Sequence, residues 1–117
     1  MPLVVFSFYK RRPDLSHEEY IAYWRDRHGP LLRDTPEITK YLSRYVQHDL
    51  RPNSAQSHVA ALEFDGMSEV WYKEGARRED LLAEPFFLER VVPDEPNFID
   101  VAATRFSTYS TPSIMIG

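Results

Sequence analysis

Residues 14–30 read D-L-S-H-E-E-Y-I-A-Y-W-R-D-R-H-G-P and contain signals for both ends of one amphipathic helix. The Ser16 side chain can accept a hydrogen bond from the N–H of Glu19, whose carboxylate can reach back to the N–H of Ser16. This capping box predicts a helix that begins at His17. Because glycine and proline favour a helix end, we expect the helix to finish at residues 28–30. One face of this helix is formed by Tyr20, Ile21, Trp24 and His28.

Four segments around this helix have the alternating pattern that is typical of β-strands. The first covers residues 3–9, with Val4, Phe6 and Phe8 on one side. The second covers residues 39–48, the third residues 58–65, where Gly66 should end it, and the fourth residues 98–109. One row of the second strand is aromatic and polar and consists of Tyr41, Ser43, Tyr45 and Gln47.

Residues 69–92 have helical periodicity, which Gly75 and Pro85 interrupt. We expect Ser68 to open a short helix there, followed by a joint and one or two more helical turns, with residues 93–96 ending the segment. The resulting order, strand-helix-strand-strand-helix-strand, predicts an α+β fold of the ferredoxin-like βαββαβ type. Four antiparallel strands would form the sheet, with both helices on one face. Residues 1–110 would form this single domain, and residues 111–117 a C-terminal tail.

A sheet covered on one face leaves its other face bare, and Tyr41, Tyr45 and several phenylalanines are candidates for that face. Because such exposure is costly, we expect a second copy of the chain to pack there, sheet against sheet. The sequence therefore predicts a homodimer with a barrel-like interior.

Composition excludes several classes of function. The chain has 117 residues, with 14 basic and 18 acidic side chains and a net charge of -4, which disfavours nucleic-acid binding. It has no cysteine and no apolar run long enough to span a membrane, so we expect a protein of the cytoplasm. No motif for a metal or a nucleotide cofactor is present, and although one histidine would suffice to bind haem, nothing specific favours it. Aromatic residues make up 14% of the chain, which favours a ligand pocket or a subunit interface.

His28 is the first candidate for catalysis, because the pKa of an imidazole lies near neutral pH. A histidine at a helix end can equally well stabilise that end. Asp100 lies between Phe98 and Ala102 on a predicted apolar strand face, where it would pair with a base such as His28 or form a salt bridge at the strand edge.

The row on the second strand could bind an aromatic ligand or form a dimer interface. We expect the ligand, with Tyr45 as a catalytic group and Tyr41, Ser43 and Gln47 as binding groups. Trp24 and Trp71 are expected on helices, where packing is their first role, and with Phe98 they complete the candidate aromatic lining. The remaining histidines are expected to face solvent: His17, His48 and His58.

Four motifs in order resemble the EthD family: R-D-R-H-G-P at 25–30, R-Y-V-Q at 44–47, D-G-M-S-E-V-W-Y at 65–72 and P-D-E-P-N-F-I-D at 93–100. The resemblance implies a dimeric α+β barrel, a fold shared with monooxygenases, muconolactone isomerases and cofactor-free enzymes that modify polyketides. Family members are similar to proteins named for ether degradation and to enzymes thought to decarboxylate or dehydrate aromatic polyketides.

The leading hypothesis is a cofactor-independent enzyme that decarboxylates or dehydrates a polyketide-like aromatic or a β-keto acid. His28 would be the general acid or base, Tyr45 and Gln47 would hold the enolate oxygen, and Asp100 would orient His28. Two alternatives stay open: a cofactor-free monooxygenase of an anthrone-type ring, and a non-enzymatic module that binds a hydrophobic metabolite.

Overall fold

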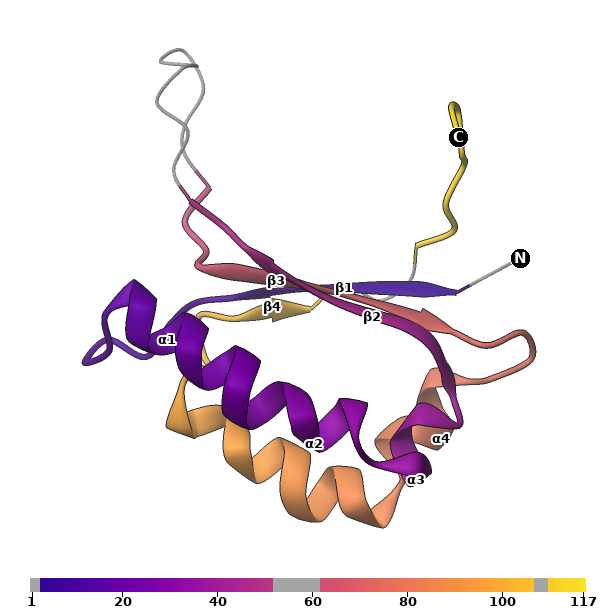
Figure 1. Ribbon diagram of the computed structural model, residues 1–117, viewed down its shortest axis with the longest axis horizontal. Helices are drawn as coiled ribbons and strands as arrows, with labels where there is room; N and C mark the ends of the chain where they lie inside the picture. The colour runs from indigo at the N-terminus through magenta and orange to yellow at the C-terminus, as the bar shows by residue number, and fades with distance from the viewer. Residues whose placement is uncertain (1–2, 52–61, 107–109) are drawn as a thin grey trace.

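The structure is a computed structural model that describes residues 3–51, 62–106 and 110–117. Its four antiparallel strands are β1 (Val4–Tyr9), β2 (Leu42–Asp49), β3 (Gly66–Tyr72) and β4 (Arg105–Phe106), in the order β2-β3-β1-β4. All helices lie on one face of this sheet, and the C-terminal tail leaves on the other side (Figure 1). The predicted α+β, ferredoxin-like architecture is confirmed, although several of its elements lie elsewhere along the chain.

The first helical segment begins as expected but does not end at Gly29 and Pro30. Ser16 and Glu19 form both bonds of the capping box, and α1 covers His17–Tyr23. A π-helical turn, η1 (Trp24–His28), follows, in which the Gly29 N–H bonds to the Trp24 carbonyl. The path then continues as α2 (Gly29–Arg33), with Pro30 in its first turn, where no N–H is needed. A short helix, α3 (Pro36–Thr39), occupies the segment where the second strand was expected to start.

The third strand is displaced along the sequence. Part of the predicted strand lies outside the described residues, residues 62–65 form no strand, and β3 starts at Gly66, where the prediction placed a break. Gly66 is required there because a Cβ would lie 2.6 Å from the Trp24 ring. Residues 66–72 alternate between the two faces of the sheet and pair with both β1 and β2. This pairing outweighs the local helical signal at Ser68.

β2 contains a register shift between Leu42 and Arg44. An extra residue in a strand reverses the alternation, so the predicted row does not continue across this point. Leu42 packs in the core, Ser43 is exposed, and Tyr45 and Gln47 lie opposite Val70 and Ser68. Tyr45 therefore faces the helices, whereas the prediction placed it on the bare face of the sheet.

The last third of the chain also differs from the prediction. Residues 78–97 form α4 (Arg78–Leu82), a π-helical turn η2 (Phe87–Val91) and a 3-10 helix η3 (Val92–Asn97), so the segment expected to end the helices continues them. Asp100 lies in a turn, and the fourth strand is reduced to β4, with residues 107–109 outside the description. Ile99 and Ser110 add isolated bridges to Arg11 and Val4.

Two hydrophobic clusters join the helices to the sheet. One is centred on Ile38, Leu81 and Tyr72, and the other stacks Tyr20 between Trp24 and Phe98. Within the described residues, no helix is both long and apolar enough to cross a bilayer.

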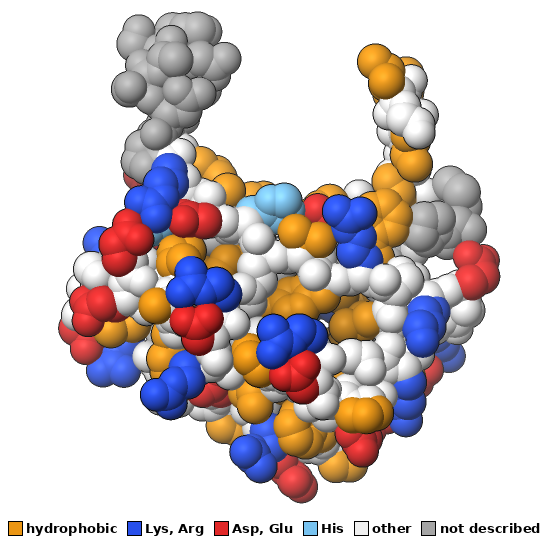
Figure 2. All heavy atoms as spheres, in the orientation of Figure 1, with side chains coloured by type: hydrophobic (Ala, Val, Ile, Leu, Met, Phe, Trp, Pro, Cys, Tyr) orange, Lys and Arg blue, Asp and Glu red, His pale blue; other side chains and the backbone are white. Residues whose placement is uncertain are grey.

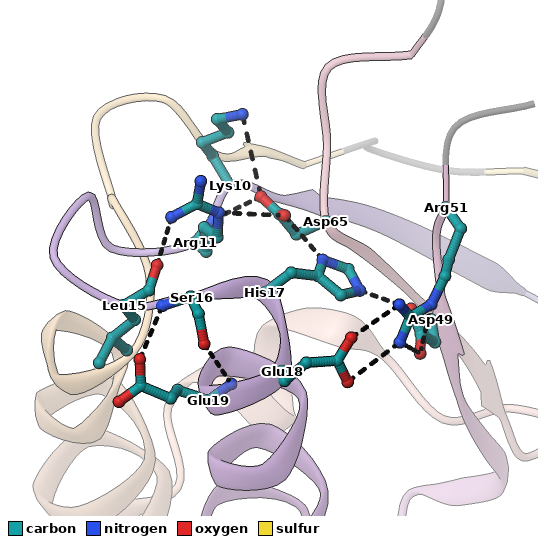
Figure 3. A network of polar contacts seen from close by, with 10 residues as sticks. All are labelled: Lys10, Arg11, Leu15, Ser16, His17, Glu18, Glu19, Asp49, Arg51 and Asp65. Carbon is teal, nitrogen blue, oxygen red and sulfur yellow. Dashed lines mark hydrogen bonds and ion pairs between the residues drawn. The ribbon is translucent and has the colours of Figure 1, made fainter.

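A network of hydrogen bonds and ion pairs connects the start of α1 to the end of β2 and the residue before β3 (Figure 3). His17 bridges two carboxylates, with Nδ1 at 2.8 Å from Asp65 and Nε2 at 2.7 Å from Asp49. Arg11 and Arg51 extend the network, Arg11 to Asp65 and Arg51 to Asp49. Because both ring nitrogens face acceptors, the contacts favour the doubly protonated imidazolium.

Candidate functional site

His28 lies at the end of the π-helical turn, with its imidazole between the helical layer and the sheet. Only 5% of the surface of this residue is exposed. Its Nδ1 is 2.9 Å from Oδ2 of Asp94, in η3. The other carboxylate oxygen of Asp94 accepts hydrogen bonds from Tyr23 and Asn97. Phe98 packs against the imidazole, with ring centroids 4.7 Å apart. These contacts fix both the position and the orientation of the ring.

The surroundings of His28 favour its neutral form. Burial lowers the pKa of His28 below its ordinary value, although the hydrogen bond to Asp94 acts in the opposite direction. Burial would raise the pKa of Asp94, but the hydrogen bonds from Tyr23 and His28 hold it below its usual range. An ionised carboxylate only accepts hydrogen bonds, so the Nδ1 of neutral His28 carries the proton and its Nε2 has a free lone pair.

A cavity of about 90 Å³ lies between the sheet and the helices, and His28 is part of its wall. The side-chain hydrogen bond of His28 within the described residues is the one between Nδ1 and Asp94. The cavity wall also contains Tyr9, Ser68 and Tyr45, and the Tyr9 hydroxyl lies 3.3 Å from the Ser68 hydroxyl. An apolar cavity of roughly 150 Å³ is known to hold benzene, so this smaller one suits a functional group better than a ring.

Glu95 is another titratable group with an altered pKa in this cavity wall. Burial raises the pKa of Glu95, and the negative charge of its neighbour Asp94 raises it further. The environment thus shifts the pKa of His28 downward and that of Glu95 upward. Two groups in one cavity wall whose pKa values are shifted in opposite directions are candidates for a base and an acid.

Tyr45 and Gln47 are held beside the π-helical turn. Nε2 of Gln47 donates to the carbonyl of Trp24 at 3.0 Å and to the Tyr45 hydroxyl at 2.9 Å. Because the Tyr45 oxygen accepts from Gln47, its own proton is available to another acceptor. Burial raises the pKa of Tyr45, so the phenol stays protonated. Gly29 permits this approach, since a Cβ there would lie 2.9 Å from Nε2 of Gln47.

Asp100 does not pair with His28. Its Oδ1 accepts a hydrogen bond from the N–H of Ala103, and its own N–H donates to the Lys10 carbonyl. The carboxylate thus caps the turn before β4, and Asp94 occupies the place beside the imidazole that was expected for Asp100. The predicted apolar strand around Asp100 is absent, which removes the pattern on which that expectation rested.

The other predicted site residues are dispersed. Trp24 and Phe98 belong to the hydrophobic cluster around Tyr20. Tyr41 packs against the other cluster, and its hydroxyl donates a hydrogen bond to Glu84. Trp71 lies on β3 and not on a helix, and its Nε1 donates to Glu69 at 2.5 Å. Ser43 and Gln47 line a separate groove beside β2.

The three remaining histidines have different surroundings. His17 is held in the ionic network at the start of α1, and His48 lies 3.1 Å from the Glu69 carboxylate. His58 lies outside the described residues. Within the described part of the chain, no three His, Cys, Asp or Glu side chains are grouped so that they could hold a metal ion.

Sequence reasoning missed Asp94, Glu95, Tyr9 and Ser68. Asp94 and Glu95 fall in the P-D-E-P-N-F-I-D motif, which was interpreted as a helix end and as part of the family resemblance, with no role for either side chain. A pair of acidic residues between two prolines was the available signal. No sequence signal marked Tyr9 or Ser68, because the two residues come together only through the pairing of β1 with β3.

Comparisons with known proteins agree with this fold. A sequence model of the EthD domain matches residues 12–102. An EthD family protein from Bacillus halodurans C-125 aligns with a TM-score of 0.66 at 16% identity, over 97% of this chain and 100% of that one. An EthD-like protein from Ralstonia eutropha JMP134 aligns with a TM-score of 0.62 at 20% identity, over 91% of this chain and 89% of the other. No significant match was found among curated proteins. The match over most of the sequence means that this chain belongs to the EthD domain family.

Proposed function

We propose that this protein is a cofactor-independent lyase that dehydrates or decarboxylates a polyketide-like aromatic or β-keto compound. The observation that carries the proposal is that one cavity wall contains both His28, bonded to Asp94 and with a pKa lowered by burial, and Glu95, whose pKa burial raises. This combination supplies a base and an acid without a metal or an organic cofactor.

Of the two reactions, dehydration fits the charges of the cavity better. Nε2 of His28 would remove the proton from the carbon next to a ketone, and the resulting enolate oxygen would accept the proton of Tyr45 in a hydrogen bond. The C–O bond of the β-hydroxyl group would then break as Glu95 donates its proton, which releases water. Decarboxylation would instead bring the carboxylate of the substrate close to the ionised Asp94, and like charges repel.

The experiment is a turnover assay of the full chain on a panel of aromatic β-hydroxy ketones and β-keto acids, with products identified by mass. His28→Gln should lower turnover by on the order of a hundredfold or more, the usual contribution of a positioned general base. His48→Gln, which changes a histidine outside the cavity, should retain wild-type turnover.

Three outcomes would contradict the proposal. Equal turnover of wild type and His28→Gln would exclude the base role. Oxygen consumption in step with product would favour a monooxygenase. Tight binding of aromatics with no product from any panel member would favour a binding module.

We also propose that the bare face of the sheet pairs with a second copy of the chain. The side chains opposite the cavity on β1 and β3 are largely apolar and include Phe6, Phe8, Met67 and Trp71. The tail leaves on the same side (Figure 1), and its Ile114, Met115 and Ile116 are the most exposed large apolar residues of the described chain. Apolar surface of this kind favours association.

A further inference from the structure

Three side chains with hydroxyl groups lie together on the sheet side of the cavity that His28 lines. Ser7 on β1 lies directly opposite Ser68 on β3, and 5% and 2% of their surfaces are exposed. Tyr9 follows Ser7 by two positions, so it lies on the same face of the sheet, and its hydroxyl is 3.3 Å from that of Ser68. All three residues line the cavity, and we name them the hydroxyl cluster.

The hydroxyl cluster interrupts an apolar face of the sheet. The next pair of residues on this face of β1 and β3 is Val5 and Val70. Serine is mostly exposed in folded proteins, and a buried polar group costs free energy unless it is hydrogen-bonded, so two buried serines facing each other are unusual in a sheet core. Their small size also leaves room for the cavity. This part of the cavity therefore offers both space and hydroxyl groups, which can donate and accept hydrogen bonds.

The proposed acid, Glu95, lies near the hydroxyl cluster. Burial raises the pKa of Tyr9, its hydrogen bonds with Ser68 and Ser7 act in the opposite direction, and the charge of Glu95 raises the pKa further. The Tyr9 phenol therefore stays protonated. Glu95 lines the same cavity, and in the proposed reaction it is protonated as well. A neutral acid beside neutral hydroxyl groups matches an uncharged oxygen, such as that of an alcohol or of water.

A larger groove adjoins the cavity on the side of β2. Its volume is about 420 Å³, which falls within the usual range of ligand pockets, and Leu32 and Tyr45 line both hollows. Figure 2 shows a hollow in this face of the molecule, with hydrophobic side chains in its depth. The groove has room for the apolar body of a ligand, and the shared Tyr45 places the reacting end of that ligand beside the cavity.

We propose that the hydroxyl cluster binds the leaving oxygen of the reaction, first as the β-hydroxyl group of the substrate and then as the water molecule that it becomes. This inference rests on the proposed function and narrows its substrate class to aromatic β-hydroxy ketones. When the C–O bond breaks, its electron pair stays with the oxygen, which takes the proton of Glu95 and leaves as water. The electron pair of the enolate forms the new C=C bond and restores the ketone. The proton that His28 took from carbon then returns to Glu95.

Two rates, both measured on the full chain, separate this role from proton removal. One is dehydration of 4-hydroxy-4-phenylbutan-2-one and the other β-hydroxy ketones of the panel. The other is deuterium exchange at the carbon next to the ketone in 4-phenylbutan-2-one, which has no hydroxyl to lose. Ser68→Ala and Tyr9→Phe should each lower dehydration about fivefold, the contribution of one hydrogen bond, and keep exchange within about twofold. His28→Gln should lose both rates.

Ser110→Ala is the matched control. Ser110 also pairs with β1, opposite Val4, but does not line the cavity, so this variant should keep both rates. Loss of neither rate in Ser68→Ala and Tyr9→Phe, or an equal loss of both rates, would overturn the role of the hydroxyl cluster and leave the proposed function intact.

A crystal structure of the free protein gives a readout that needs no substrate. We expect an ordered water molecule within hydrogen-bond distance of the hydroxyls of Tyr9 and Ser68, because the cavity is polar there and large enough for water. A dry hydroxyl cluster would contradict the proposal. If the water is present but the wild type neither dehydrates any panel member nor exchanges deuterium, the hydroxyl cluster is a water site and the proposed reaction fails.

Discussion

His28 has its two ring nitrogens in different surroundings. Nδ1 faces the Asp94 carboxylate at 2.9 Å, so Nε2 is the nitrogen left for a group in the cavity that His28 helps to line. A carboxylate in this position holds the imidazole in one tautomer and stabilises the imidazolium that forms when the base takes a proton. In the proposed mechanism Asp94 is therefore a positioning residue for His28, and its removal should lower turnover without removing the proposed base.

Asp94→Asn and Asp100→Asn form a matched pair of variants. In Asp94→Asn the new side-chain amide could donate to Nδ1 and favour the wrong tautomer, so this change should lower turnover by at least about tenfold; the equivalent change in a serine protease costs about 10⁴. Asp100→Asn should keep turnover within about twofold, because its carboxylate bonds only to its own turn. The pH dependence of turnover should move in Asp94→Asn alone. The reverse ranking of the two variants would restore the sequence-based role of Asp100.

At the residue scale, the sequence predicted the candidate base, His28, but not the carboxylate beside it. His28 was predicted from its near-neutral pKa and its place on a helix face, both of which are local properties. Asp94 lies 66 positions away from it, so the pairing depends on how η3 packs against η1. Tyr45 and Gln47 were predicted together because they are two positions apart on one strand, and the structure keeps them together.

The start of α1 is the element whose attachment depends on pH. His17 lies between Asp65 and Asp49, and the charged groups around them are Lys10, Arg11, Arg51 and Glu18 (Figure 3). Burial alone would lower the pKa of His17, but its hydrogen bonds to the two carboxylates outweigh burial and raise it. A raised pKa in the folded state means that protonated His17 stabilises the fold.

His17→Gln should therefore lower the free energy of unfolding more at about pH 6 than at about pH 9. The stabilisation is fully present below the pKa of an unfolded histidine, about 6.5, and is lost as the pH rises through the higher value of the folded state. The difference should be on the order of 1 kcal/mol, because the site is partly solvated. Urea unfolding at both pH values measures it.

Ser16→Ala is the control for this prediction, since it removes the helix cap at a cost of about 1 kcal/mol that does not depend on pH in this range. If His17→Gln lost the same stability at both pH values, or more at the higher one, His17 would not be held as an imidazolium.

At the element scale, local signals were sufficient where the contacts are local. The capping box placed the start of α1 at the correct residue. The prediction was wrong at Gly29 and Gly66 because Gly29 was interpreted as the end of a helix and Gly66 as the end of a strand. In the structure each is a site of close approach, Gly29 to Gln47 and Gly66 to Trp24. Such tertiary reasons for glycine leave no trace in the local pattern.

At the scale of the whole molecule, the βαββαβ order was correct even though the third strand was displaced. The order of strands and helices follows from the count of apolar segments, which tolerates errors in their boundaries. The bare sheet face and the C-terminal tail lie on the same side of the molecule (Figure 1). The proposed association of two chains through this side is the property of the whole molecule to test.

Sedimentation equilibrium should give twice the mass of the 13.8 kDa chain. Phe8→Glu places a charge on the bare face and should produce monomers, because burying an unpaired carboxylate in an interface is costly. Leu88→Glu is the control, since Leu88 is an exposed apolar residue of the helical layer. A monomeric wild type, or dimers that only Leu88→Glu disrupts, would contradict pairing through the sheet.

The state of the His28 ring tests the central claim most directly, because it requires no substrate. Nitrogen-15 NMR of the imidazoles, assigned with His28→Gln, reports both the tautomer and the pKa. We predict a neutral ring at pH 7 with its proton on Nδ1, a bare Nε2, and a titration midpoint below the ordinary value of about 6.5. A proton on Nε2 of the neutral ring, or a midpoint above that value, would contradict the assignment of His28 as the base.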